Sequence, residues 1–298
     1  MSHLAERVSP SFNVADEVRA FYERFPYPPP IDDLEKYRRD WQGSATATRR
    51  VSSVLARARL SRRSIDPHRR LRNEHALRWP AAQVTGIDCS ATSVRHTERL
   101  KKKYEMRNLQ VHELEIEDVR DLGMSFDQVV CTGVLHHLSD PVRALNALRT
   151  VLNPGGAMQL MVYAPYGRAG IYMLQEFCRQ LDIEAKGTEI RDLIGALRML
   201  PAGHPLQGLL SKAQDFRNES ALADALLHPQ DRAYSVPQFF ELIAKGGLRF
   251  GRWMKQAPYS VHCGVMTKIP QSSRIARLPP YSVGDTHPRQ HAEPSSRD

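Results

Sequence analysis

The sequence predicts an α/β fold built around a doubly wound, mostly parallel sheet. Short β-rich runs alternate with amphipathic helical runs over about residues 83–163. The runs at 126–131 and 157–163 are largely apolar, as is typical of strands that are covered on both faces. Strands that alternate with helices at this spacing pair in parallel, and their connecting helices cover both faces of the sheet.

Each element of this core has its own signal. Ser90 is expected to cap a helix that runs to about Tyr104, because serine side chains accept hydrogen bonds from free N–H groups at helix starts. Pro141 opens a second helix at the position where proline fits best, and Asn153–Gly156 breaks that helix. Strands are expected at 83–88, 109–114, 126–131 and 157–163.

Helical segments flank the core. An N-terminal helix is expected to start at Asn13 or Asp16 and to run through Tyr22, and a short helix follows over 32–41. Further helices are expected over 171–181, 189–200 and 237–244, with Ser235 as the cap of the last one, and strands over 248–254 and 261–268. The predicted organisation is an N-terminal helical extension (1–44), a core (45–166), a helical insertion or lid (167–230), a closing helix and strand pair (231–268) and a disordered tail (269–298).

The composition argues against several classes of protein. No run approaches the roughly 18 apolar residues of a membrane helix, so no membrane partner is expected. The four cysteines form no CxxC pair, which favours free thiols in the cytoplasm. Nine arginines and one acid between Arg49 and Arg72 carry +8 of the net charge of +9. This block lacks aromatic residues for base stacking, so a solvated segment is favoured over a nucleic-acid site.

Acidic residues follow two of the predicted strands, at the edge where parallel sheets bind ligands. Asp88 ends one strand, and a carboxylate there can accept from both hydroxyls of a ribose or stabilise a helix N-terminus. Glu115, Glu117 and Asp118 follow the next strand. One of these acids can accept from an adenine amino group, or all three can be solvated loop charges.

A third strand leads into Thr132-Gly-Val-Leu-His-His137. Gly133 lets a ligand approach the backbone closely. Paired histidines suggest a metal, but adjacent side chains diverge and no third ligand lies nearby in the sequence, so no metal site is predicted. The sequence leaves three roles possible for His137: a general base, a group that orients the substrate, or a packed histidine.

Taken together, Val84–Ser90, Phe126–Leu138 and Leu152–Gly156 resemble the class I S-adenosylmethionine-dependent methyltransferases in their order and spacing. The resemblance covers about residues 80–165. It implies a Rossmann-like fold, S-adenosyl-L-methionine as the cofactor and methyl transfer as the activity. It also implies a set of cofactor-binding residues: Asp88 and Cys89 at the ribose, Glu117 or Asp118 at the adenine, and Thr132, Gly133 and Val134 along the cofactor.

Substrate contacts are expected from the N-terminal segment and the helical insertion. Phe21–Pro28 is similar to a segment that precedes the core in some bacterial members of this family, where Tyr22 or Tyr27 would cap the cofactor or pack on the sheet. Tyr163 and Tyr166 follow the last strand of the core, and the insertion after them can form a lid. A small-molecule substrate is expected, and the sequence gives no oligomeric state.

One segment departs from the family pattern. The family's first strand ends in a glycine-rich loop, but no glycine lies between Gly43 and Gly86. The arginine-rich segment 51–72 stands there instead, through divergence or a locally shifted reading frame, and a missing first strand would leave a gap at the centre of the sheet. The alternative function is therefore a non-catalytic or damaged protein that keeps the fold as a binding module.

Overall fold

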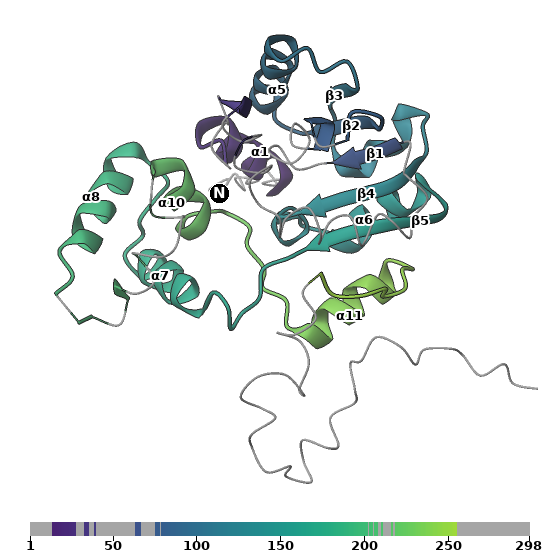
Figure 1. Ribbon diagram of the computed structural model, residues 1–298. Coiled ribbons are helices and arrows are strands. Elements are labelled where there is room, and N and C mark those ends of the chain that lie inside the picture. Colours follow the sequence, from purple (N-terminus) through teal and green to yellow (C-terminus); the bar gives the residue numbers. More distant parts are fainter. Residues whose placement is uncertain are drawn as a thin grey trace, which may run out of the picture. The chain divides into compact units, whose positions relative to one another are not determined.

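A computed structural model gives the arrangement of these elements. It describes residues 14–27, 33–35, 39, 63–66, 75–77, 79–201, 203–204, 206–207, 210, 216 and 218–254. The chain divides into two compact units, Met1–Leu248 and Arg249–Asp298. The sheet and the helices described below belong to the first unit (Figure 1).

The sheet has five parallel strands in the order β3-β2-β1-β4-β5, as the sequence predicts for a doubly wound α/β fold. The strands are β1 (Arg63–Asp66), β2 (Gln83–Asp88), β3 (Leu109–Glu113), β4 (Phe126–Thr132) and β5 (Leu152–Met161). The centre of the sheet has no gap, because β1 pairs with β2 on one side and with β4 on the other. Four residues suffice here, since a central strand takes its hydrogen bonds from two neighbours.

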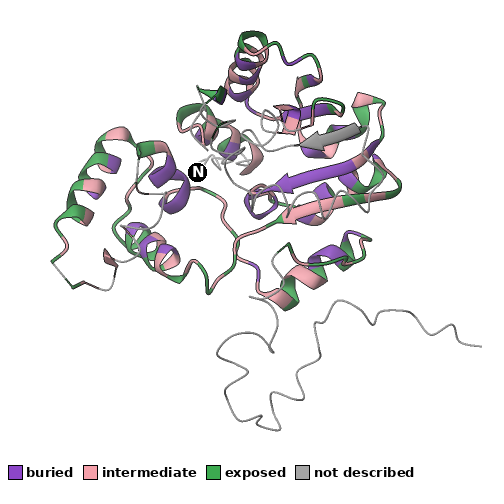
Figure 2. Ribbon diagram, viewed as in Figure 1, coloured by how far each residue is buried: buried purple, intermediate pink, exposed green. Residues whose placement is uncertain are grey.

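Helices cover the two faces of the sheet. In β2, Val84 and Ile87 point to opposite faces, because side chains alternate along a strand. Val84 packs in a cluster with Leu100 of α5 (Ala91–Lys103), and Ile87 packs in a cluster with Leu145 of α6 (Pro141–Thr150). The second cluster also takes in Leu242 of α11 (Val236–Lys245). Consequently β4 is buried along almost its whole length (Figure 2).

The predicted caps hold these helices in place. The Ser90 side chain accepts a hydrogen bond from the Ser93 N–H (3.2 Å) at the start of α5. Pro141 is the first residue of α6, after an N-cap at Asp140. Ser235 and Gln238 form a capping box at the start of α11. Short 3-10 turns, η1 (Ile116–Leu122) and η2 (Leu135–His137), follow β3 and β4.

The strand β5 begins earlier than predicted. Leu152 already pairs with Phe126, and the next aligned pair is Gln128 with Ala157, so Asn153–Gly156 form an irregularity inside the strand and do not precede it. Gly155 has φ +79°, a conformation that favours glycine. The Asn153 side chain donates to Asp127 (2.9 Å), which fixes the irregularity against the neighbouring strand.

A separate group of helices follows the sheet. It comprises α7 (Ala169–Gln180), α8 (Gly187–Arg198) and α10 (Glu219–Leu226), which lie beside one another (Figure 1). They share a hydrophobic cluster that includes Ile171, Leu174 and Leu222. Phe21 of the N-terminal helix α1 (Val14–Arg24) is buried in the same cluster, so α1 is fixed partly by the insertion.

Two further predictions concern the C-terminal part of the chain. Residues 248–254 contain no strand, contrary to the prediction, although Leu248 still packs against the cluster beneath α6 and α11. The predicted strand over 261–268, the predicted tail and most of the arginine block lie outside the described residues. Among the helices that the structure describes, none combines the length and the apolar character that a membrane crossing requires.

Candidate functional site

One cavity of about 320 Å³ lies at the carboxyl ends of the strands. Asp88 and Cys89 reach it from the end of β2, and Glu117 reaches it from η1. Gly133 and Val134 line it directly after β4. Because parallel strands end at one edge of the sheet, the order of the strands brings these groups together.

Hydrogen bonding, backbone conformation and burial define the groups at this edge. Asp88 accepts a hydrogen bond from the Ser90 N–H (3.0 Å), which fixes its carboxylate at the start of α5. Gly133 has φ +74°, so the chain turns there without a Cβ atom beside the cavity. Burial raises the pKa of Glu117. Burial and the charge of Asp88 raise the pKa of Cys89 to about 12, so its thiol stays protonated.

Helix α1 closes one side of the cavity with Val14, Val18 and Tyr22. Polar contacts on both sides hold this helix. Glu23 accepts from the Ser90 hydroxyl (2.8 Å) and from the Thr92 N–H (3.2 Å) at the free N-terminus of α5. The hydrogen bond from the Thr92 hydroxyl is the main cause that lowers the pKa of Glu23. Arg19 forms an ion pair with Glu115.

Part of the cavity lining is aromatic. Tyr22, Tyr27, Tyr163 and His137 contribute to it. The ring of His137 lies 6.3 Å from that of Tyr22 and 5.9 Å from that of Tyr163, both nearly perpendicular to it. Asp224 of α10 also lines the cavity, and it is 2% exposed. The Tyr22 hydroxyl donates to Asp224 (3.1 Å). Burial and the charge of Asp224 raise the pKa of Tyr22 well above its ordinary value, so the phenol remains a donor.

The main chain of Gln230 sets the protonation of two histidines. Its carbonyl lies 2.8 Å from Nδ1 of His137, and because a carbonyl only accepts, Nδ1 carries the proton and Nε2 keeps a lone pair. Its N–H donates to Nδ1 of His228 (3.0 Å), so the proton of that ring lies on Nε2. The two rings are 3.9 Å apart. Burial lowers the pKa of both, so both are neutral near pH 7.

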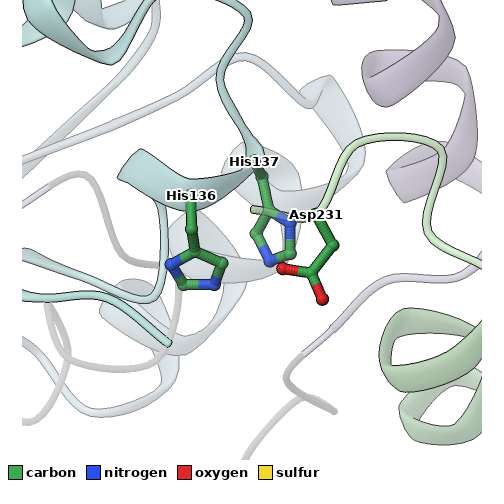
Figure 3. A group of neighbouring side chains, drawn as sticks. All are labelled: His136, His137 and Asp231. Atoms are coloured by element: carbon green, nitrogen blue, oxygen red, sulfur yellow. The ribbon is translucent and has the colours of Figure 1, made fainter. Parts of the chain in front are cut away.

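The fold also brings together groups that resemble metal ligands. Nitrogen and oxygen atoms of His136, His137 and Asp231 lie within 4.8 Å of one another, as do those of His137, Asp224 and His228. Figure 3 shows both adjacent histidines on one turn and Asp231 reaching His137 from another segment. Two of these groups already take part in hydrogen bonds. His228 accepts from Gln230 at Nδ1 and so carries its proton on Nε2, and Asp231 accepts from Gln175 (2.9 Å).

Tyr163 is fixed between two groups. The ring of His136 lies 3.9 Å from its centre and the guanidinium carbon of Arg168 lies 3.8 Å from it. Groups that close cannot share one face of a ring, so they lie on opposite faces. The backbone adds a further bond, from the Tyr234 N–H to the Tyr163 carbonyl (2.8 Å). The Tyr163 side chain therefore has a defined position at the rim of the cavity.

The structure brings most, but not all, of the predicted site residues to this cavity. Asp88, Cys89, Glu117, Gly133, Val134, His137, Tyr22, Tyr27 and Tyr163 line it. Asp118, Thr132 and Tyr166 are not among the described residues that do so. Asp118 is exposed, Thr132 is buried inside β4, and Tyr166 is 89% exposed.

The sequence reasoning missed Asp224, His228 and Asp231. They lie far along the chain from His137, in the helical insertion and the segment that follows it, and no spacing linked them to the strands. The available signal was the isolated Asp224 on the apolar helix Glu219–Leu226, where an acid is out of place unless it has a partner or a function.

Comparisons with known proteins find a methyltransferase domain within the chain. Residues 54–158 match the family model described as a methyltransferase domain. An uncharacterized protein of Synechococcus sp. is 35% identical over 178 residues, which cover 57% of this chain and 42% of the relative. A tRNA U34 carboxymethyltransferase of Campylobacter hominis is 51% identical over 47 residues, 16% of each chain. A ubiquinone biosynthesis O-methyltransferase of Albidiferax ferrireducens is 36% identical over 76 residues, 25% of this chain and 30% of the relative.

Residues 54–158 therefore form a methyltransferase domain, and this match supports the class I S-adenosylmethionine-dependent methyltransferase family. The matched domain runs from before β1 to within β5 and includes most of the arginine-rich segment. S-adenosylmethionine is the cofactor of this family, which confirms the predicted cofactor. The chain spans less than half the length of each of the three relatives, so the substrates in their names are not assigned to this chain.

Proposed function

We propose that the chain transfers a methyl group from S-adenosylmethionine to a small molecule held between the sheet and the helical insertion. The observation that carries the proposal is a single cavity that is lined both by Asp88 and Glu117 and by a cluster of Tyr22, His137, Tyr163 and Asp224. Asp88 and Glu117 suit the ribose hydroxyls and the adenine amino group. The part lined by His137, Tyr163 and Asp224 is then left for the methyl group and its acceptor.

In the reaction, a nucleophile of the acceptor attacks the methyl carbon in line with the carbon–sulfur bond. Alignment supplies most of the rate of such a step. His137 is placed to take the acceptor's proton, because its Nε2 lone pair is available and its Nδ1 proton is held by the Gln230 carbonyl. The fixed ring of Tyr163 orients the acceptor.

The character of the cavity argues against a nucleic-acid acceptor at this site. Its described lining includes four acids (Asp88, Glu115, Glu117 and Asp224) and neither lysine nor arginine. Phosphates would be repelled there, whereas nucleic-acid sites gather positive charge. The name of the tRNA-modifying relative rests on a match over 16% of this chain.

A binding module without catalysis is the second candidate, and one observation favours it. No glycine stands between Gly43 and Gly86, where this family binds the amino-acid end of the cofactor. Titration calorimetry with S-adenosylhomocysteine and S-adenosylmethionine separates the two. If the chain is an enzyme, we expect it to bind these ligands with micromolar affinity. The absence of binding at millimolar ligand would favour the binding module.

The same titration tests the assigned ribose contact. Asp88→Ala should weaken S-adenosylhomocysteine binding by about tenfold or more, since hydrogen bonds from neutral hydroxyls to a carboxylate contribute about 1.5–3 kcal/mol. Asp118→Ala, which removes an exposed acid outside the cavity lining, is the matched control and should bind like the unmodified chain. If all three proteins bind S-adenosylhomocysteine with equal affinity, Asp88 does not contact the ligand.

A further inference from the structure

The acceptor part of the cavity is built for a positive charge. Asp224 places a carboxylate there, 2% exposed and fixed by the Tyr22 hydroxyl at 3.1 Å. Tyr22 and Tyr27 contribute two electron-rich rings to the same lining. A buried carboxylate beside aromatic faces is a combination that binds ammonium groups.

We propose that the acceptor is an amine, which enters as an ammonium ion with Asp224 as its counter-charge and the rings of Tyr22 and Tyr27 beside it. The proposal deepens the proposed function and rests on it. It names the chemical class of the acceptor, whereas methyl transfer alone fits oxygen, nitrogen, sulfur and carbon nucleophiles.

The charge balance of the reaction favours nitrogen over oxygen. The ammonium first gives a proton to Nε2 of His137, which leaves a neutral amine. The nitrogen lone pair then attacks the methyl carbon, the carbon–nitrogen bond forms, and the carbon–sulfur electron pair returns to sulfur. The products are a methylated ammonium and uncharged S-adenosylhomocysteine, so Asp224 faces a cation before and after transfer. A hydroxyl acceptor would instead develop negative charge beside Asp224, which the carboxylate would oppose.

The arrangement of His137 and Asp224 supports this division of roles. Their polar atoms lie within 4.8 Å of each other and of His228, so one ammonium group can contact both. His137 takes the proton because its free nitrogen is Nε2. Asp224 holds the charge because its other partner, Tyr22, stays protonated.

Sinefungin tests the proposal without knowledge of the natural acceptor. It shares the adenosine and amino-acid ends of S-adenosylhomocysteine but carries a protonated amine where the transferable methyl group would stand. Calorimetry should show that the unmodified chain binds sinefungin at least about tenfold more tightly than S-adenosylhomocysteine. Asp224→Asn should abolish that preference while leaving the affinity for S-adenosylhomocysteine unchanged. Asp231→Asn, an acid of the same region outside the cavity lining, should keep the preference.

A second measurement separates an amine site from a general preference for cations at the methyl position. Phenethylamine and 2-phenylethanol differ only in the acceptor group, and each is titrated into the complex with S-adenosylhomocysteine. The amine should bind at least about tenfold more tightly, and Asp224→Asn should equalise the two. Equal binding to the unmodified complex, or a preference that survives Asp224→Asn, would overturn the proposal. Failure of S-adenosylhomocysteine itself to bind would instead overturn the proposed function.

Discussion

At the scale of single residues, the protonation of His137 decides whether a base is present at the cavity. Burial lowers its pKa below the ordinary value near 6.5, the Gln230 carbonyl and Asp231 act in the opposite direction, and Arg168 lowers it further. Asp224, His228, Tyr22 and Tyr163 also face the ring. The neutral form therefore persists to lower pH than in a free histidine.

This predicts the acid side of the pH–rate profile. The rate with saturating cofactor and an amine acceptor should stay level down to pH 6.5 and fall only below it, since His137 is neutral above its lowered pKa. His137→Asn keeps a side-chain N–H for the Gln230 carbonyl but removes the base. It should lower the rate by about a hundredfold or more and leave S-adenosylhomocysteine binding intact. An unchanged rate would exclude the histidine from proton transfer.

Single residues also show where sequence reasoning ends. Asp88, Glu117 and Gly133 could be predicted from the sequence because they follow strands, and the fold fixes where strands end. Asp224 could not, because its contact with Tyr22 joins positions 202 residues apart. A local pattern carries no information on which helix of an insertion returns to the sheet.

At the scale of elements, α1 acts as a cover that side chains fasten to the core. Glu23 takes hydrogen bonds from the start of α5, Arg19 pairs with Glu115, and Tyr22 reaches α10. These contacts border the cavity, so we expect movement of α1 to accompany the release of a bound cofactor.

Weakening one of these contacts should therefore alter the kinetics of release. Glu23→Gln removes the charge that accepts from Ser90 and Thr92 and should raise the dissociation rate of S-adenosylhomocysteine several-fold, with a smaller effect on association. Stopped-flow displacement measures both rates. Glu17→Gln, an exposed acid of the same helix, serves as the control. If both variants release the ligand at the rate of the unmodified chain, α1 does not gate the cavity.

Elements were predictable to different degrees. The signals at Ser90, Pro141 and Ser235 predicted the starts of three helices, because capping depends on residues close in sequence. The strand β1 was missed, since Arg63–Asp66 lacks an apolar run and is held by pairing with two neighbours. The predicted strand over 248–254 has the apolar alternation of a strand but no ladder among the described residues.

At the scale of the whole molecule, burial of neutral histidines links folding to pH. His137 and His228 both have pKa values below the ordinary one in the folded chain, for which burial is the main cause. When the chain unfolds, both regain a pKa near 6.5 and bind protons. Stability is thus complete above about pH 6.5 and falls as the pH drops from there toward the folded-state values.

Denaturant titrations should show this decline. Each histidine contributes a slope of about 1.4 kcal/mol per pH unit to the free energy of unfolding within that window. His228→Asn, whose amide oxygen can still accept from the Gln230 N–H, should reduce the combined slope by about half. A slope that does not change in this variant would show that His228 already titrates like a free histidine.

The bonds made by Gln230 have a consequence for how the family can vary. Both come from the peptide group, so the side chain at that position takes no part in deciding which ring nitrogen bears hydrogen. Evolution can exchange that side chain widely and keep the chemistry of the two imidazoles. Proline alone would break the arrangement, because it has no amide hydrogen to offer His228.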